Sequence, residues 1–193
     1  MDALIRSRLS SRKATPGQTL ENPVTGERFT FIHTAASSGG ALLAFDFALR
    51  PGGAVPIAHV HPIQRETFAV IAGRMRFRLG LRTRTAGPGD VVVVEPGVAH
   101  AFANAGAEEA RLRVEVRPAL AMEDMLAEVV AMAQAGRMTR RGLPRNPAEL
   151  AALARRYERE ARAPLLSAGV QRLLLAPFAL AAAPRRPARP AVG

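Results

Sequence analysis

Short stretches of alternating apolar and polar residues run from about residue 21 to residue 118, and they constrain the fold more than any other feature. In the clearest of them, residues 74–79, Met75, Phe77 and Leu79 alternate with arginines. Successive side chains of a β-strand point to opposite faces, so this strand has one apolar face and one charged face. Glycine, proline and asparagine separate the stretches, as they separate the strands of antiparallel sheets. We therefore predict an all-β region.

Four consecutive valines at residues 91–94 break the alternation. A strand that is apolar on both faces needs cover on both. We therefore predict that a helix, a docked tail or a partner subunit covers its outer face, and we expect a homodimer.

The periodicity changes after Pro118, where apolar residues take up helical spacing over residues 120–135 and Gly136 stands at the position of a C-terminal cap. Asn146 and Pro147 are typical of the start of a second helix, which we expect to run to about Arg162. A third apolar segment covers residues 165–183. The predicted organisation is an N-terminal arm (1–20), a β-domain (21–118), a helical extension (119–183) and a disordered basic tail (184–193).

The chain has no cysteine and four histidines, so a bound metal needs His, Asp or Glu ligands. His59 and His61 would share one face of a strand, about 6.5 Å apart along it. A turn could return Glu66 to the same point, and His100 could add a third imidazole from a distant strand. This ligand set suits divalent Fe, Mn, Ni, Co, Cu or Zn and does not choose among them. The fourth histidine, His33, is predicted to be a surface or strand residue.

Two motifs surround these residues. The first runs from Gly53 through the histidine pair and the glutamate to Gly73, and the second runs from Gly89 through Pro96, Gly97 and His100 to Asn104. Together they resemble the paired motifs of the cupin superfamily, with one departure, Glu95 in place of the usual proline. The resemblance implies a mainly β fold, a single double-stranded β-helix (jelly-roll) barrel, here followed by the α-helical extension. It also implies the metal ligands His59, His61, Glu66 and His100.

We expect the barrel to enclose a pocket for a small, mostly apolar or aromatic molecule with a metal-chelating oxygen. The candidate pocket residues are Phe45, Phe47, Gln64, Phe68, Met75, Phe77 and Phe102. Arg50 and Arg65 are further polar candidates for orienting a substrate. No second carboxylate is obvious near the motifs, so a dedicated general acid or base is not evident from the sequence.

Two functions fit this interpretation. The first is a metalloenzyme, oxygenase-like or isomerase-like, that acts on a small organic substrate inside the barrel. The alternative is a non-catalytic barrel that binds or senses a small ligand and whose metal is structural. The fold by itself does not decide between them.

Because the net charge is +11, nucleic acid and anionic membranes have to be considered as partners. Nucleic acid is disfavoured, since aromatic residues make up only 5% of the chain and stacking platforms need them. For the third apolar segment we favour a helix that packs on the barrel or at a dimer contact. Peripheral membrane contact through residues 165–189 is the second choice, and a membrane span is the last. Residues 1–16 hold no apolar run of signal-peptide length, so we expect a cytoplasmic protein.

Overall fold

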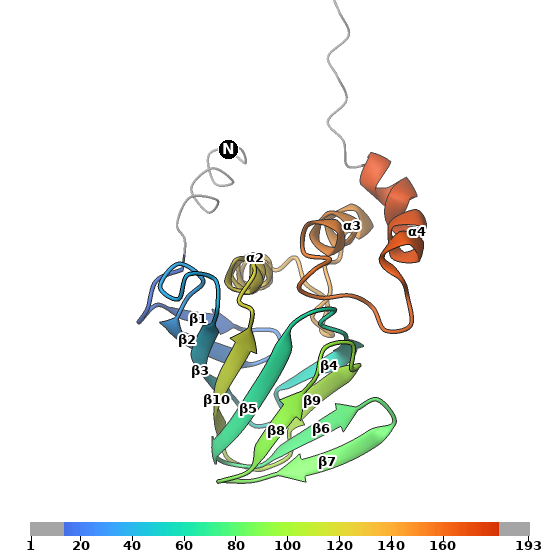
Figure 1. Cartoon of the computed structure of the whole chain (residues 1–193). Coiled ribbons are helices and arrows are strands. Elements are labelled where there is room, and N and C mark those ends of the chain that lie inside the picture. Colours follow the sequence, from blue (N-terminus) through green and yellow to red (C-terminus); the bar gives the residue numbers. More distant parts are fainter. Residues whose placement is uncertain (1–13, 182–193) are drawn as a thin grey trace, which may run out of the picture.

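The computed structural model describes residues 14–181, in which ten strands come first and three helices follow (Figure 1). The strands are β1 (Thr19–Asn22), β2 (Glu27–His33), β3 (Leu43–Leu49), β4 (Ala54–His59), β5 (Arg65–Ala72), β6 (Met75–Leu79), β7 (Arg82–Ala86), β8 (Val91–Val94), β9 (His100–Asn104) and β10 (Ala110–Arg117). The helices are α2 (Met122–Gln134), α3 (Pro147–Arg156) and α4 (Ala168–Ala181). The predicted basic tail and most of the predicted N-terminal arm lie outside the described residues.

The strands form two antiparallel sheets. The larger has the order β1-β2-β3-β10-β5-β8 and the smaller the order β4-β9-β6-β7. Their inner faces meet, because the ring of Phe102 on β9 packs 5.8 Å from the ring of Phe47 and 5.3 Å from that of Phe68, measured between centroids. The predicted mainly β barrel with a C-terminal helical extension is confirmed.

The alternating pattern decides which side chains fill the barrel. Met75 and Phe77 on β6 are buried, whereas Arg76 and Arg78 between them are exposed. Strand β10 repeats this arrangement with Leu112, Val114 and Val116 inside. Burial of such side chains, at about 25 cal/mol per Å² of apolar surface, favours this register, because a slip by one residue would place the arginines inside.

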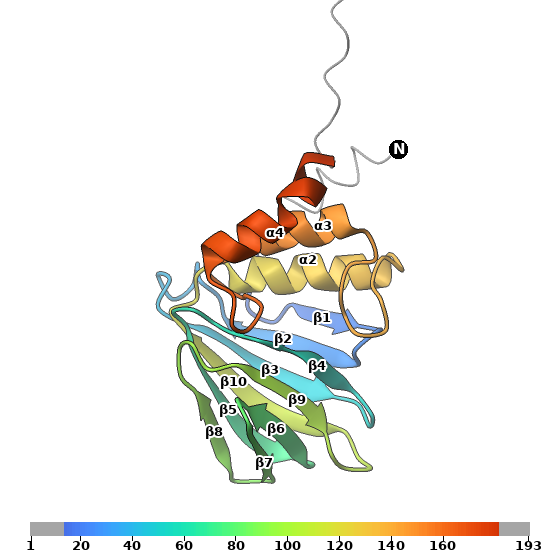
Figure 2. The same cartoon turned by 90° about the vertical axis from the view of Figure 1, so that its right-hand side faces the viewer.

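The valine strand β8 forms one edge of the larger sheet. Val92 and Val94 are buried, whereas Val91 is 48% exposed and lies beside Ala69 of β5. The described helices gather at another part of the barrel (Figures 1 and 2). Residues 14–181 therefore contain no helix that covers this outer face, and cover by a partner subunit stays a prediction.

Helix α2 lies across β1 and β2 (Figure 2). Its residues Met122 and Val130 belong to the same buried cluster as the barrel phenylalanines. Gly136 follows the helix with a φ of +69°, and Arg137 N–H closes the end on the Met132 carbonyl, so the predicted cap is confirmed.

Helix α3 begins as predicted, because the Asn146 side chain accepts a hydrogen bond from Ala148 N–H. The predicted end at about Arg162 was wrong, since the helix stops at Arg156. Beyond it the chain turns back to the barrel, where Arg162 and Val60 exchange two backbone hydrogen bonds. Pairing with the end of β4 thus replaces the last predicted turn of helix.

Helix α4 packs mainly against α3 and not directly on the barrel (Figure 1). Pro177 lies inside this helix. Among the described residues, no helix has the length and apolarity that crossing a membrane requires.

Candidate metal centre and cavity

Three histidines converge at one end of the barrel. His59 ends β4 and is the register partner of His100, which begins β9. The pairing shifts between Val55 and His59, an irregularity of the kind often found beside functional sites. His61 was expected to lie in the same strand as His59, but it lies just beyond the end of β4. One ligand atom from each ring lies within 4.8 Å of the other two.

Backbone carbonyls orient all three rings. The Nδ1 atoms of His59, His61 and His100 lie 3.2, 2.5 and 3.2 Å from their acceptors, which are the carbonyl oxygens of Ile57, Glu160 and Val98. A carbonyl only accepts hydrogen bonds, so each Nδ1 carries the proton. In a neutral ring this leaves Nε2 with a lone pair, the form in which histidine binds metals.

Glu66 on β5 stands beside two of the rings. Its Oε2 lies 3.2 Å from Nε2 of His61 and 3.2 Å from Nε2 of His100. Burial by itself raises the pKa of this carboxyl, but its close interactions with His100 and His61 outweigh burial and hold the pKa well below its usual range. The carboxylate is therefore ionised and ready to interact with a cation.

The histidines differ in protonation. Burial and the neighbouring rings of His100 and His61 lower the pKa of His59 to about 3, so its imidazole stays neutral. For His61, burial lowers the pKa, but hydrogen bonding to Glu66 and the charge of that carboxylate raise it above its usual value overall. A metal ion at this site would have to displace the His61 proton.

A buried nitrogen tests whether these residues suit a metal ion. Nε2 of His100 has no hydrogen-bond partner within residues 14–181, although Glu66 is near, because the contact does not have hydrogen-bond geometry. Buried polar atoms are rarely left unpaired. An electron-pair donor that faces two other imidazoles and a carboxylate fits a divalent transition metal ion, and the donor set lacks the thiolates that soft metals select.

A cavity of about 240 Å³ adjoins this cluster. Four predicted pocket residues line it: Phe45, Phe47, Phe68 and Phe102. Further apolar lining comes from the barrel and from α2, namely Phe29, Val55, Ile57, Val114, Val116, Met122, Met125, Leu126, Val129 and Val130. Its polar lining consists of Asn22, Thr25, Glu27, His59, His61, Glu66 and Arg141.

The other predicted pocket residues do not line this cavity. Met75 and Phe77 are buried behind the cavity wall, where the Phe77 ring packs 5.1 Å from that of Phe68. The Gln64 amide donates hydrogen bonds to the backbone carbonyls of Pro118 and Ala119. It therefore fixes the start of the helical extension to the barrel.

The two nominated arginines also lie elsewhere. Arg65 pairs with Glu95 on the surface, and Arg50 donates to the Pro23 carbonyl.

Residues 45–117 match the family model described as Cupin domain. This segment of the chain is a cupin domain. No curated protein matches the chain significantly.

Solved structures resemble the cupin barrel at low identity. An uncharacterized conserved protein with a double-stranded β-helix domain from Klebsiella pneumoniae is 19% identical, covering 58% of this chain and 87% of its own, with a TM-score of 0.43. A predicted oxalate decarboxylase from Thermotoga maritima is 20% identical over 52% of this chain and 90% of its own, with a TM-score of 0.47. The polyketide cyclase RemF from Streptomyces resistomycificus is 18% identical over 55% of this chain and 78% of its own, with a TM-score of 0.46.

The helical extension forms part of the cupin site and does not only follow it in the chain. Helix α2 supplies one wall of the cavity, and Ala161 lines it near the histidines. The Glu160 side chain accepts a hydrogen bond from Ala121 N–H, while its backbone carbonyl accepts from His61. The sequence motifs end before these residues, and a backbone carbonyl leaves no signal in side-chain identity.

Glu27 begins β2 and lines the cavity, although it is not among the residues predicted from the sequence. A signal was present, since Glu27, Phe29 and Phe31 alternate along one strand and therefore share its inner face. The cavity therefore contains a second carboxyl group besides Glu66, which was not identified from the sequence.

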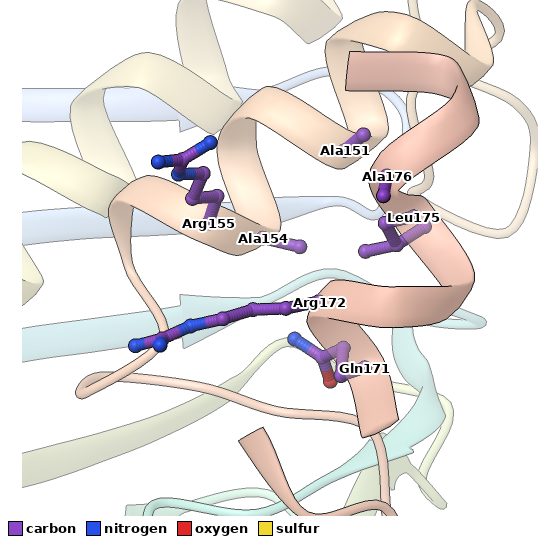
Figure 3. A pocket seen from close by; sticks show the side chains of 7 residues that line it. All are labelled: Ala151, Ala154, Arg155, Gln171, Arg172, Leu175 and Ala176. Atoms are coloured by element: carbon purple, nitrogen blue, oxygen red, sulfur yellow. The ribbon is translucent and has the colours of Figure 1, made fainter. Parts of the chain in front are cut away.

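A second hollow, about 250 Å³, lies between α3 and α4 (Figure 3). Its lining consists of Ala151, Ala154, Arg155, Gln171, Arg172, Leu175 and Ala176. Arg172 is paired with Glu158, and the rest of the lining combines apolar side chains with those of Arg155 and Gln171. The hollow shares no lining residue with the histidine cavity.

Proposed function

We propose that this cupin holds one divalent transition metal ion with His59, His61, Glu66 and His100, and that it acts on a small organic molecule bound in the adjoining cavity. The orphaned Nε2 of buried His100, facing two further imidazoles and a carboxylate, carries the proposal. A bound metal of this kind supplies Lewis-acid polarisation of a substrate oxygen and, if redox-active, electron transfer.

The protein's own residues perform the remaining tasks. The carbonyls of Ile57, Val98 and Glu160 hold the three rings in one orientation. The aromatic and aliphatic lining excludes water and selects a mostly apolar molecule. This arrangement suits an oxygenase-like or isomerase-like enzyme.

The alternative is a non-catalytic ligand-binding or sensing cupin with a structural metal. It is supported by the cavity lining, in which apolar side chains predominate. The effect of metal loss on stability separates the two. An open, functional site loses its metal with little change in melting temperature, whereas a structural site loses the fold with the metal.

Elemental analysis and thermal melting of the purified protein test the proposal. We expect one transition metal ion per chain, lost in His59→Ala, with a melting temperature close to that of the parent. His33→Ala is the matched control, because His33 is exposed and outside the cluster. A parent protein without transition metal, even after reconstitution, contradicts the proposal, and collapse of His59→Ala favours the structural alternative.

A further inference from the structure

The first residue of β2, Glu27, faces the same cavity as the histidines. Phe29, two residues later, lines the cavity as well, so the period of two along the strand directs both side chains inward. No step of the proposed metal site uses this carboxyl. A carboxyl group in an apolar cavity is costly when ionised, which calls for an explanation of its presence.

The hydrogen bonds of Glu27 use one of its two oxygens. Oε2 accepts from Thr25 Oγ1 and, at 3.2 Å, from Asn22 Nδ2. Oε1 makes no hydrogen bond with any residue in the described part of the chain. The turn before β2 therefore holds the carboxyl in place and leaves one oxygen for a molecule in the cavity.

The groups that face Glu27 explain its protonation. Glu66, His59 and His61 line the cavity with it, and Arg141, from the segment between α2 and α3, lies at the cavity's exposed edge. Burial raises the pKa of Glu27 to about 7, the hydrogen bonds from Thr25 and Asn22 oppose this, and the charge of Glu66 adds to it. A carboxyl in this range carries its proton for much of the time near neutral pH.

Glu27 and the histidine cluster lie towards opposite ends of β4. Thr25, next but one to Glu27, accepts a backbone hydrogen bond from Ala54 at the start of this strand. His59 is the last residue of the same strand. Apolar side chains of the barrel and α2 line the space between. A molecule that meets the histidines with one end therefore extends towards Glu27 with the other.

We propose that protonated Glu27 donates a hydrogen bond to a neutral oxygen of the molecule bound in the cavity, at the end away from the histidines. This inference rests on the proposed function and narrows its substrate class. The ligand is a small, largely apolar molecule with two oxygen functions, one that binds metal and one neutral acceptor such as a ketone, ester or amide. A carboxylate at the second position is disfavoured, because the ionised form of Glu27 would repel it.

Metal-chelating probes of known structure test this in the zinc-loaded protein. We would titrate 3-acetyl- and 4-acetylbenzohydroxamic acid against their isopropyl analogues, which have the same shape without the acceptor oxygen. At pH 6 we expect at least one acetyl probe to bind roughly 3- to 10-fold more tightly than its isopropyl partner, the range of one hydrogen bond. At pH 8, where Glu27 is ionised, the preference should disappear.

Variants distinguish a ligand contact from a structural one. Glu27→Gln keeps a donor at every pH, so the acetyl preference should persist at pH 8, whereas Glu27→Leu should lose it. Glu21→Gln, an exposed position on the preceding strand, should behave as the parent does. Carbon-13 NMR of the glutamate carboxyls adds a readout without probes: one signal titrating near pH 7, absent from Glu27→Gln.

Two negative outcomes have different meanings. Equal binding of acetyl and isopropyl probes at both pH values overturns this inference and leaves Glu27 as a turn-stabilising residue. If unsubstituted benzohydroxamic acid itself does not bind the zinc-loaded protein, the metal-centred cavity of the proposed function fails, and this inference fails with it.

Discussion

Nδ1 of His61 lies 2.5 Å from the backbone carbonyl oxygen of Glu160, a residue 99 positions later in the chain. This contact joins the metal-ligand candidates of the barrel to the helical extension. The Glu160 side chain is itself held by Ala121 N–H, at 3.1 Å. The orientation of His61 thus depends on a segment that the cupin motifs do not include.

Loss of the Glu160 side chain should weaken metal binding from outside the ligand set. In Glu160→Ala the bond to Ala121 N–H is absent, so the segment that carries the carbonyl gains freedom. We expect about a 10-fold loss of zinc affinity, the lower end of what outer hydrogen-bond partners of metal-binding histidines contribute. Competition with a chromogenic chelator measures it. Glu160→Gln keeps an acceptor oxygen and should stay near the parent value; equal affinities for parent and Glu160→Ala would contradict the role of the segment.

Metal binding should release protons near pH 6.5. The raised pKa of His61 favours its protonated form in the metal-free protein, whereas His59, with a pKa of about 3, has no proton to lose there. Metal ions bind only neutral imidazole, so affinity should fall as the pH is lowered. Calorimetry in two buffers of different ionisation enthalpy counts the protons. Release of none would show that His61 is already neutral.

Glu27 should make the free energy of unfolding fall as the pH rises. Its pKa is 4.5 in the reference state and about 7 in the folded protein, so the folded state binds more protons between these values and loses stability across this window. Glu27→Gln should remove this slope and gain up to about 3 kcal/mol over the parent at pH 8, since each pKa unit corresponds to about 1.4 kcal/mol.

Urea unfolding from pH 4.5 to 8 provides the measurement. The difference between Glu27→Gln and the parent isolates this one carboxyl from the histidines, which titrate in both proteins. Glu21→Gln supplies the control. A constant difference across the window would rule out a raised pKa for Glu27.

Gly73 and Gly80 should respond differently to alanine, although both have positive φ. At Gly73 (φ +79°) an added Cβ would lie 2.6 Å from the backbone Cα of Ala110, whereas at Gly80 (φ +58°) it meets no atom within 4 Å. Gly80→Ala should cost about 1 kcal/mol from backbone strain alone. Gly73→Ala adds a clash with a neighbouring strand and should cost clearly more. Denaturant melts of the two variants compare them, and equal losses would contradict the close approach at Gly73.

The outer face of β8 should mediate self-association. Ile71 and Val91 are 50% and 48% exposed on the two adjacent strands at this edge of the larger sheet. We expect the parent to be a dimer and Val91→Arg to shift it towards monomer, measured by light scattering after size exclusion. Leu81→Arg, in the turn between β6 and β7, is the control and should leave the dimer intact. A monomeric parent would contradict this prediction.

Local patterns allowed the barrel and much of the site to be predicted. The alternation along β6 and β10 depends only on neighbouring residues, because side-chain direction has a period of two in any strand. The same holds for the Asn146 cap and for the Gly136 stop, which need one local hydrogen-bond pattern each. The spacing of His59, His61, Glu66 and His100 also lies within the sequence, and their convergence followed once the strands were placed.

Only the tertiary structure decided what surrounds the histidines. The end of α3 at Arg156, the Glu160 carbonyl on His61 and the wall that α2 gives to the cavity all depend on contacts between distant segments. Gln64 points to the extension and not to the cavity for the same reason. Glu27 had the right alternation, but its partners across the cavity are set by the curvature of the two sheets. Sequence periodicity determined which side chains point inward; the packing of barrel and extension determined which of them meet.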